Sequence, residues 1–173
     1  MRKLLVGSAL VAVVTVACMQ TASAVPLDES TSGLVRGDAR YSVPQQGSNA
    51  ESATARSAAA GNCGVRVDFP HASYTTSAQI HTRAESYCNV LPVQANSVSG
   101  VTYRSRSYGW QRQGSAAAGP KAAQNLRITV AVNYKVGDLY RYRTEARGVA
   151  VIAGRTYTAA AYEQNDDEIR CNA

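Results

Sequence analysis

The sequence has few of the side chains on which most enzyme and metal sites depend. Its 173 residues include two histidines, and they contain neither a Cys-x-x-Cys pair nor a Gly-x-Ser-x-Gly motif. The missing motifs remove the usual sequence marks of a zinc site and of a serine hydrolase. We therefore expect no metal site and no cofactor, and we favour a non-enzymatic protein over an enzyme.

Two short polar segments are the remaining candidates for chemistry. In DFPH, Asp68 and His71 could join a hydrolytic triad, which would need a serine from elsewhere in the chain. Neither His71 nor His81 has a partner at a spacing typical of metal ligands. The acidic residues of YEQNDDEIRC, 162–171, could hold calcium, but they lack the EF-hand pattern, so we expect a solvated loop.

Long apolar runs are absent except at the N-terminus. Two basic residues precede the apolar run 4–17, and small residues suited to a signal peptidase follow it. We predict a signal peptide over residues 1–24, cleaved before Val25, and a secreted, extracellular product. The run is shorter than the ~20 residues of a membrane span, so we expect no membrane span. A lipoprotein attached through Cys18 is the alternative.

The chain after the predicted signal peptide divides into two parts. Residues 25–61 are rich in Ser, Ala, Gly, Pro and Gln and show no hydrophobic periodicity. Such a composition buries too little apolar area to offset the entropy of ordering the backbone, which predicts a disordered arm, linker or propeptide. Residues 62–173 are enough for one small domain.

Hydrophobic residues alternate with polar ones through most of residues 62–173. The clearest case is the segment 126–136, where Leu, Ile, Val and Tyr occupy every second position. Period two over six or seven segments predicts an all-β fold, an antiparallel β-sandwich or small barrel of six to seven strands. We expect a hairpin at Ala153–Gly154. We expect another at Gly137–Asp138, with a three-residue loop or a bulge, because a two-residue turn would place arginines on the apolar face.

Three cysteines remain after the predicted cleavage, enough for one disulfide and one free thiol. The pair Cys63–Cys88 is favoured because strands close in sequence usually lie side by side. The alternative, Cys88–Cys171, would close a longer loop and stabilise somewhat more in the chain-entropy model.

Positive charge gathers in the middle of the domain. Between residues 104 and 155 there are ten Lys or Arg and two acidic residues, a balance of +8. An exported basic face suits an anionic extracellular polymer such as a wall polymer, a polysaccharide or DNA, and arginines beside aromatic rings suit sugars and nucleotides. The candidate binding residues are Arg104, Arg106, Tyr108, Trp110, Arg112, Arg141 and Arg143.

The stretch YRSRSYGWQRQ, 103–113, leaves two positions open for its tryptophan. In plain alternation Trp110 shares one face with Arg104 and Arg106. A bulge at Gly109 would instead turn Trp110 into the core, which is favoured because a lone tryptophan in a small domain is highly buried on average.

We infer an exported, non-enzymatic β-sandwich protein of unknown role that binds an anionic polymer or envelope component through an arginine-rich face. The alternative is a protein-binding module such as an inhibitor of an extracellular protease, with Gly114–Lys121 as its presenting loop. An unrecognised hydrolase is the third hypothesis.

The sequence resembles a loose group of small uncharacterised exported proteins of actinobacteria, through NCGVRVDFPH, YRYRTEARG and the closing EIRCNA. This resemblance carries no activity or site. A second similarity, to immunoglobulin domains, comes from Cys88, Trp110 and Cys171. Ile169 stands where that pattern has tyrosine, so we attribute this similarity to convergent sandwich packing.

Overall fold

The computed structural model describes residues 33–42, 62–89 and 92–170. These residues form β-strands joined by turns and loops, and they contain no helix. The predicted all-β class is confirmed. The strands are β1 (Val35–Arg36), β2 (Asp38–Arg40), β3 (Cys63–Val67), β4 (His71–Ala72), β5 (Gln79–Cys88), β6 (Val93–Arg106), β7 (Gly109–Lys121), β8 (Asn125–Asn133), β9 (Leu139–Tyr140), β10 (Tyr142–Ile152), β11 (Arg155–Gln164) and β12 (Ile169–Arg170).

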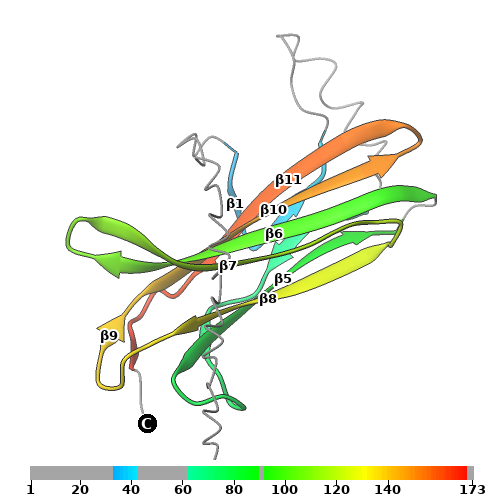
Figure 1. Cartoon of the computed structure of the whole chain (residues 1–173). Coiled ribbons are helices and arrows are strands. Elements are labelled where there is room, and N and C mark those ends of the chain that lie inside the picture. The colour runs from blue at the N-terminus through cyan, green and yellow to red at the C-terminus, as the bar shows by residue number, and fades with distance from the viewer. Residues whose placement is uncertain (1–32, 43–61, 90–91, 171–173) are drawn as a thin grey trace, which may run out of the picture. The chain divides into compact units, whose positions relative to one another are not determined.

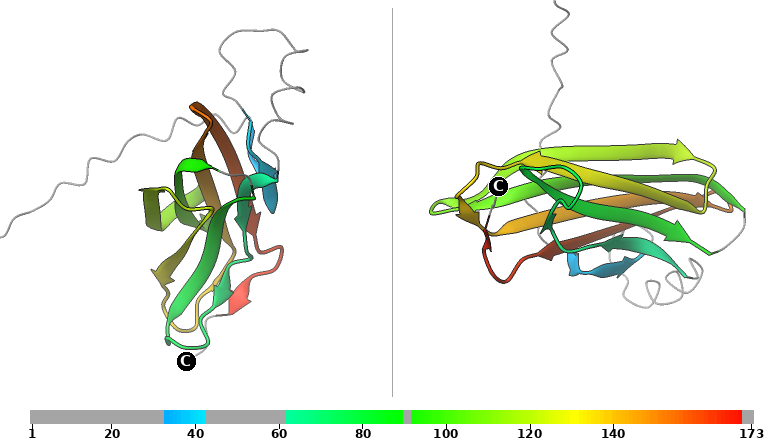
Figure 2. Two further views of the ribbon diagram at one scale, coloured as in Figure 1. Left: turned by 90° about the vertical axis from the view of Figure 1, so that its right-hand side faces the viewer. Right: turned by 90° about the horizontal axis from the view of Figure 1, so that it is seen from below.

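Two five-stranded sheets form the sandwich (Figure 1). The first sheet has the order β1-β11-β10-β6-β7. The second has the order β2-β3-β5-β4, with β8 also paired to β5, and β9 and β12 form a separate two-stranded ribbon. All strand pairs are antiparallel except β1 with β11. Figure 2 shows the long strands of the two sheets as separate layers.

The period-two pattern places the core between the sheets. In β8 the residues Ile128, Val130 and Val132 are buried, while the residues between them are exposed. The sheets also share polar interior groups. Thr144 on the first sheet donates to Thr82 on the second at 2.9 Å, and its hydroxyl lies 2.7 Å from that of Thr102. Each hydroxyl therefore has a partner inside the core, as buried polar groups require.

The N-terminal strands correct the prediction that the whole segment 25–61 is a disordered arm. Within it, β1 pairs with β11 and β2 pairs with β3, so the chain crosses from one sheet to the other at Gly37. Tyr41 is fully buried. This buried ring and the ladder hydrogen bonds offset the entropy of ordering the chain. The average composition of the segment gives no sign of these short strands. Residues 25–32 and 43–61 lie outside the described residues, as does the predicted signal peptide.

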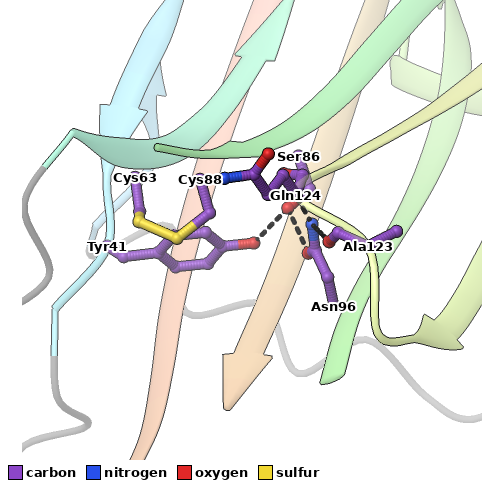
Figure 3. Close-up of a disulfide and its surroundings, with 7 residues drawn as sticks. All are labelled: Tyr41, Cys63, Ser86, Cys88, Asn96, Ala123 and Gln124. Atoms are coloured by element: carbon purple, nitrogen blue, oxygen red, sulfur yellow. Dashed lines mark hydrogen bonds between the residues drawn. A yellow bond between two sulfur atoms is a disulfide. The ribbon is translucent and has the colours of Figure 1, made fainter. Parts of the chain in front are cut away.

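A disulfide joins Cys63 to Cys88, which confirms the favoured pairing and rules out Cys88–Cys171. Its two cysteines are ladder partners on β3 and β5 (Figure 3). The bridge therefore lies within one sheet. An immunoglobulin disulfide joins the two sheets, so the similarity to that family does not extend to this feature. Cys171 lies outside the described residues.

The disulfide adjoins a buried chain of hydrogen bonds that leads into the first sheet (Figure 3). The Tyr41 hydroxyl lies 2.6 Å from that of Ser86, which donates to the side-chain oxygen of Asn96 on β6. The amide of Asn96 then donates to the carbonyl groups of Ala123 and Gln124 at 3.1 and 3.3 Å. The two layers are thus held by specific polar contacts as well as by apolar packing.

One predicted hairpin forms and the other does not. Ile152 pairs with Arg155 across Ala153–Gly154, both with positive φ, as a two-residue hairpin turn requires. At Gly137 the chain instead passes from the second sheet to the first, because β8 pairs with β5 and β10 pairs with β6 and β11. This change of sheet keeps the arginines of β10 off the apolar face without the expected bulge.

Candidate functional site

The stretch 103–113 is a hairpin and does not form one strand. Arg106 pairs with Gly109 and Ser105 with Trp110, so the chain reverses at Ser107–Tyr108. Figure 1 shows this β6–β7 hairpin extending past the neighbouring strands of the first sheet. The shared face that plain alternation would give to Trp110, Arg104 and Arg106 therefore does not form, because the turn divides these residues between the two faces of the hairpin.

The outer face of the first sheet is formed by the side chains that point away from the core. Thr102 and Thr144 are buried ladder partners, so their neighbours Tyr103 and Arg143 project outward. Arg143 is the ladder partner of Tyr103, which is in turn the partner of Arg112. These three side chains form one row across β10, β6 and β7.

A second row lies beside the first at the base of the hairpin. The carbonyl of Arg141 accepts a hydrogen bond from the N–H of Ser105 at 2.9 Å, and the N–H of Arg141 donates to the hydroxyl of Ser105 at 3.1 Å. The ladder partner of Ser105 is Trp110. We call the outward-facing set the outer arginine patch, which consists of Tyr103, Trp110, Arg112, Arg141, Arg143 and Arg147.

Several contacts hold the rings and arginines of the outer arginine patch together. The guanidinium of Arg143 lies 4.4 Å from the ring centre of Tyr162. Burial raises the pKa of Tyr103, and Glu145 adds to this effect, while Arg112, Arg143 and Arg147 lower it. Three arginines and one glutamate therefore surround this phenol, so cations outnumber carboxylates around Tyr103.

Most arginines of the outer arginine patch have no carboxylate partner among the described residues. Arg143 forms an ion pair with Glu145 at 2.9 Å. Arg112 donates to the neutral hydroxyl of Ser115 at 2.9 Å. Neither Arg112, Arg141 nor Arg147 has a carboxylate partner within the described ranges, and all three are exposed. Their guanidinium donors are therefore available to an anionic ligand.

Trp110 lies on this surface and not in the core, with 40% of its area exposed. Gly109 has a φ of 120°, but it is the first residue of β7 and follows the turn directly. The irregularity of the β6–β7 ladder nearest to Trp110 falls instead between Thr102 and Tyr103, opposite Gln113. The favoured core position is thus wrong because the bulge that it required is elsewhere.

Arg104 and Arg106 project from the inner side of the same hairpin. Their guanidinium groups lie 4.6 and 4.8 Å from the ring centre of Tyr140 on β9, and Arg106 donates to the hydroxyl of Tyr140 at 2.8 Å. Both arginines also donate to Gln111, at 3.3 and 3.1 Å. Because they project from the inner side, these two arginines connect the hairpin to β9 and do not belong to the outer arginine patch.

An open hollow of about 470 Å³ adjoins this connection. Its lining includes Arg106, Tyr140, Glu168 and the hairpin-turn residue Tyr108, which is 76% exposed. The seven predicted binding residues are therefore split three ways. Trp110, Arg112, Arg141 and Arg143 come together on the outer face, Arg104 and Arg106 lie on the inner face, and Tyr108 is at the tip.

Two members of the outer arginine patch, Tyr103 and Arg147, and the adjoining ring of Tyr162 could not be identified from local sequence. Tyr103 joins the surface as the ladder partner of Arg143 and Arg112, while Arg147 and Tyr162 come from strands distant in the chain. Their positions depend on the register of β10 with β6 and β11. The only usable signal was alternation within β10, where arginine recurs at 141, 143 and 147.

The remaining candidates have structural explanations. Of the acidic cluster, Glu163 and Asp166 form ion pairs with Arg36 at 3.2 and 3.0 Å. Gly114–Lys121 belongs to β7, so the segment expected to be a presenting loop is a strand. Strand geometry removes the main support for the inhibitor hypothesis.

Within the described ranges, no three His, Cys, Asp or Glu side chains form a group that could hold a metal ion. The same residues contain no helix suited to crossing a membrane. Comparison with known protein families, curated proteins and solved structures finds no match to the chain. The geometry of the outer arginine patch is therefore the basis for a functional proposal.

Proposed function

We propose that this is an exported, non-enzymatic protein that binds an anionic extracellular polymer through the outer arginine patch. The supporting observation is the set of exposed guanidinium groups of Arg112, Arg141 and Arg147, which have no carboxylate partner in the described part of the chain. A polymer with repeated phosphate, sulfate or carboxylate groups offers one anion to each. The exposed ring of Trp110 adds a flat surface on which a sugar or base can stack.

Export is part of this proposal. The disulfide Cys63–Cys88 is typical of proteins that fold in an oxidising compartment, and the N-terminal run followed by small residues is typical of a cleaved signal peptide. Intact mass of the secreted protein should give a chain that begins at Val25. An acylated chain that begins at Cys18 would contradict the soluble extracellular assignment.

Binding to heparin and to double-stranded DNA at several salt concentrations tests the surface. We expect affinity to fall steeply with salt, because each neutralised phosphate releases condensed counterions. For DNA, the variant Arg112→Gln/Arg141→Gln should reduce the magnitude of the slope of log K against log [salt] by about 2, because each phosphate contact contributes roughly 0.9 to that slope.

The matched control is Arg40→Gln/Arg83→Gln on the outer face of the second sheet, which removes the same charge. Neither of its arginines takes part in an ion pair within the described ranges. Equal losses in both variants would show that net charge alone attracts the polymer. A parent protein with no salt-dependent binding to either polymer would refute the proposal.

A further inference from the structure

His71 and His81 face each other on two neighbouring strands, although they are ten positions apart in the sequence. They are ladder partners in β4 and β5. Partners on antiparallel strands have Cβ atoms about 4.5–5.5 Å apart. Two imidazole nitrogens on a tetrahedral zinc ion lie about 3.3 Å apart, given Zn–N distances of about 2.0–2.1 Å. The fold thus supplies the spacing that the sequence lacked, which corrects the expectation that neither histidine has a partner.

Both side chains lie on the outer face of the second sheet. Ile80 and Thr82 are fully buried, so His81 between them projects outward, and Ala72 packs against the core, so His71 also projects outward. Both histidines are half-buried. Their rings are therefore reachable from solvent and held on one surface.

The hydrogen bonds of His71 determine which nitrogen is free. Its Nδ1 lies 3.0 Å from the carbonyl oxygen of Phe69. A carbonyl can only accept, so Nδ1 carries the proton and the lone pair of Nε2 is unused. The ring of Tyr74 stacks on that of His71, with centroids 6.1 Å apart.

The hydrogen bonds of His81 lead to the complementary result. The Nε2 of His81 lies 3.0 Å from Oε1 of Gln79, and the amide nitrogen of Gln79 donates to the side-chain oxygen of Asn133 at 3.1 Å. This second bond fixes the amide so that its oxygen faces the imidazole. His81 therefore donates through Nε2 and keeps a free lone pair on Nδ1.

Metal-binding histidines usually donate their second ring N–H to a carbonyl or similar acceptor, which fixes the tautomer. Imidazole favours late first-row divalent ions. We propose that His71 and His81 form a two-histidine site for such an ion, with Zn²⁺, Ni²⁺ and Cu²⁺ as the candidates. Water completes the coordination, because no third His, Cys, Asp or Glu converges here among the described residues. The site is independent of the polymer-binding proposal.

Calorimetric titration of the mature protein with Zn²⁺ and with Ni²⁺ at pH 7.5 tests this site. We expect one ion per chain, and we expect His71→Ala and His81→Ala each to weaken binding as far as the double variant does, since a chelate needs both rings. The chain has only these two histidines, so no other imidazole contributes. Gln79→Ala should weaken binding about tenfold by releasing the His81 tautomer.

Circular dichroism of each variant establishes that it is folded before titration. Binding that survives in the double variant would place the ion elsewhere and overturn the proposal. Single variants that retain the parent affinity would show that the histidines act separately, which also overturns it. Absence of binding by the folded parent would have the same consequence.

Discussion

The outer faces of the two sheets carry similar numbers of arginines and differ in how those arginines are neutralised. On the first sheet one carboxylate, Glu145, lies among Arg112, Arg141, Arg143 and Arg147. On the second, the arginines are accompanied by three carboxylates, and the set is Arg40, Arg66, Arg83 and Arg127 with Asp38, Asp68 and Glu85. The two faces therefore differ in the number of carboxylates that accompany the arginines, and this difference is the reason why we propose the first face for polymer binding.

Glu85 neutralises two of the arginines on the outer face of the second sheet. Its carboxylate accepts from Arg66 at 2.7 Å and from Arg127 at 3.1 Å, so two guanidinium groups share one buried acceptor. Tyr87, two residues after Glu85 in β5, lies with its ring beneath the guanidinium groups of Arg40 and Arg66. Its hydroxyl donates to the carboxylate of Asp38 at 2.7 Å. These arginines stabilise the sheet, while those of the outer arginine patch have few internal partners.

The largest expected effect comes from the covalent link in the second sheet. Cys63→Ala/Cys88→Ala should lower the free energy of unfolding by about 3 kcal/mol, because the bridge restricts a loop with a sequence separation of 25 in the unfolded chain. Urea denaturation measures this change. Polymer binding by the folded variant should be unchanged. Loss of binding without loss of folding would contradict the separation between the two faces.

A smaller effect on stability and a large one on binding are expected for Trp110→Ala. With 40% of its area exposed, Trp110 should contribute clearly less to folding than a fully buried tryptophan, whereas lost stacking should weaken binding to a sugar or nucleotide polymer by ~1–3 kcal/mol. Thermal denaturation and a heparin titration separate the two. A fall in stability of ~3–5 kcal/mol would instead indicate a buried tryptophan.

The smallest expected effect concerns Glu85→Gln. Burial alone would raise the pKa of Glu85, but hydrogen bonds and charge from Arg66 and Arg127 outweigh it, so the pKa lies below its ordinary value of 4.5. A lowered pKa in the folded state means that the carboxylate stabilises the fold above about pH 4.5 and that this contribution disappears as the pH falls through the folded value.

At pH 7 the variant should therefore be less stable by about 1 kcal/mol, and the difference from the parent should shrink towards pH 3. Denaturation at a series of pH values measures this trend. Because Arg66 and Arg127 lose their counter-charge, polymer binding by the second face should also increase. A difference in stability that stays constant with pH would show that the charge of Glu85 has no role.

The alternation of residues was sufficient to predict the all-β class, the hairpin at Ala153–Gly154 and the inward face of β8. It could not predict which strands pair across the chain, because period two assigns sides within a strand and not neighbours between strands. The change of sheet after Asn133 was missed for this reason, whereas β1 and β2 were missed because the composition of residues 25–61 shows no hydrophobic periodicity.

The candidate site was predicted in part, and its errors come from one turn. Arginines and aromatic rings were singled out from the sequence as the distinctive residues of 103–113, but the reversal at Ser107–Tyr108 divides them between opposite faces of the hairpin. The pair His71 and His81 was missed because cross-strand register, which no local spacing reveals, brings it together. Long-range pairing therefore decides both surfaces.

The most direct test of the difference between the faces is a ¹H–¹⁵N NMR titration of the mature protein with a heparin-derived oligosaccharide. The account predicts shifts for amides of Tyr103, Arg112 and Arg143 and for the indole N–H of Trp110, the only one in the chain. Amides around Arg66 and Arg127 should remain unperturbed. Shifts concentrated on β3, β5 and β8, or spread equally over both sheets, would contradict it.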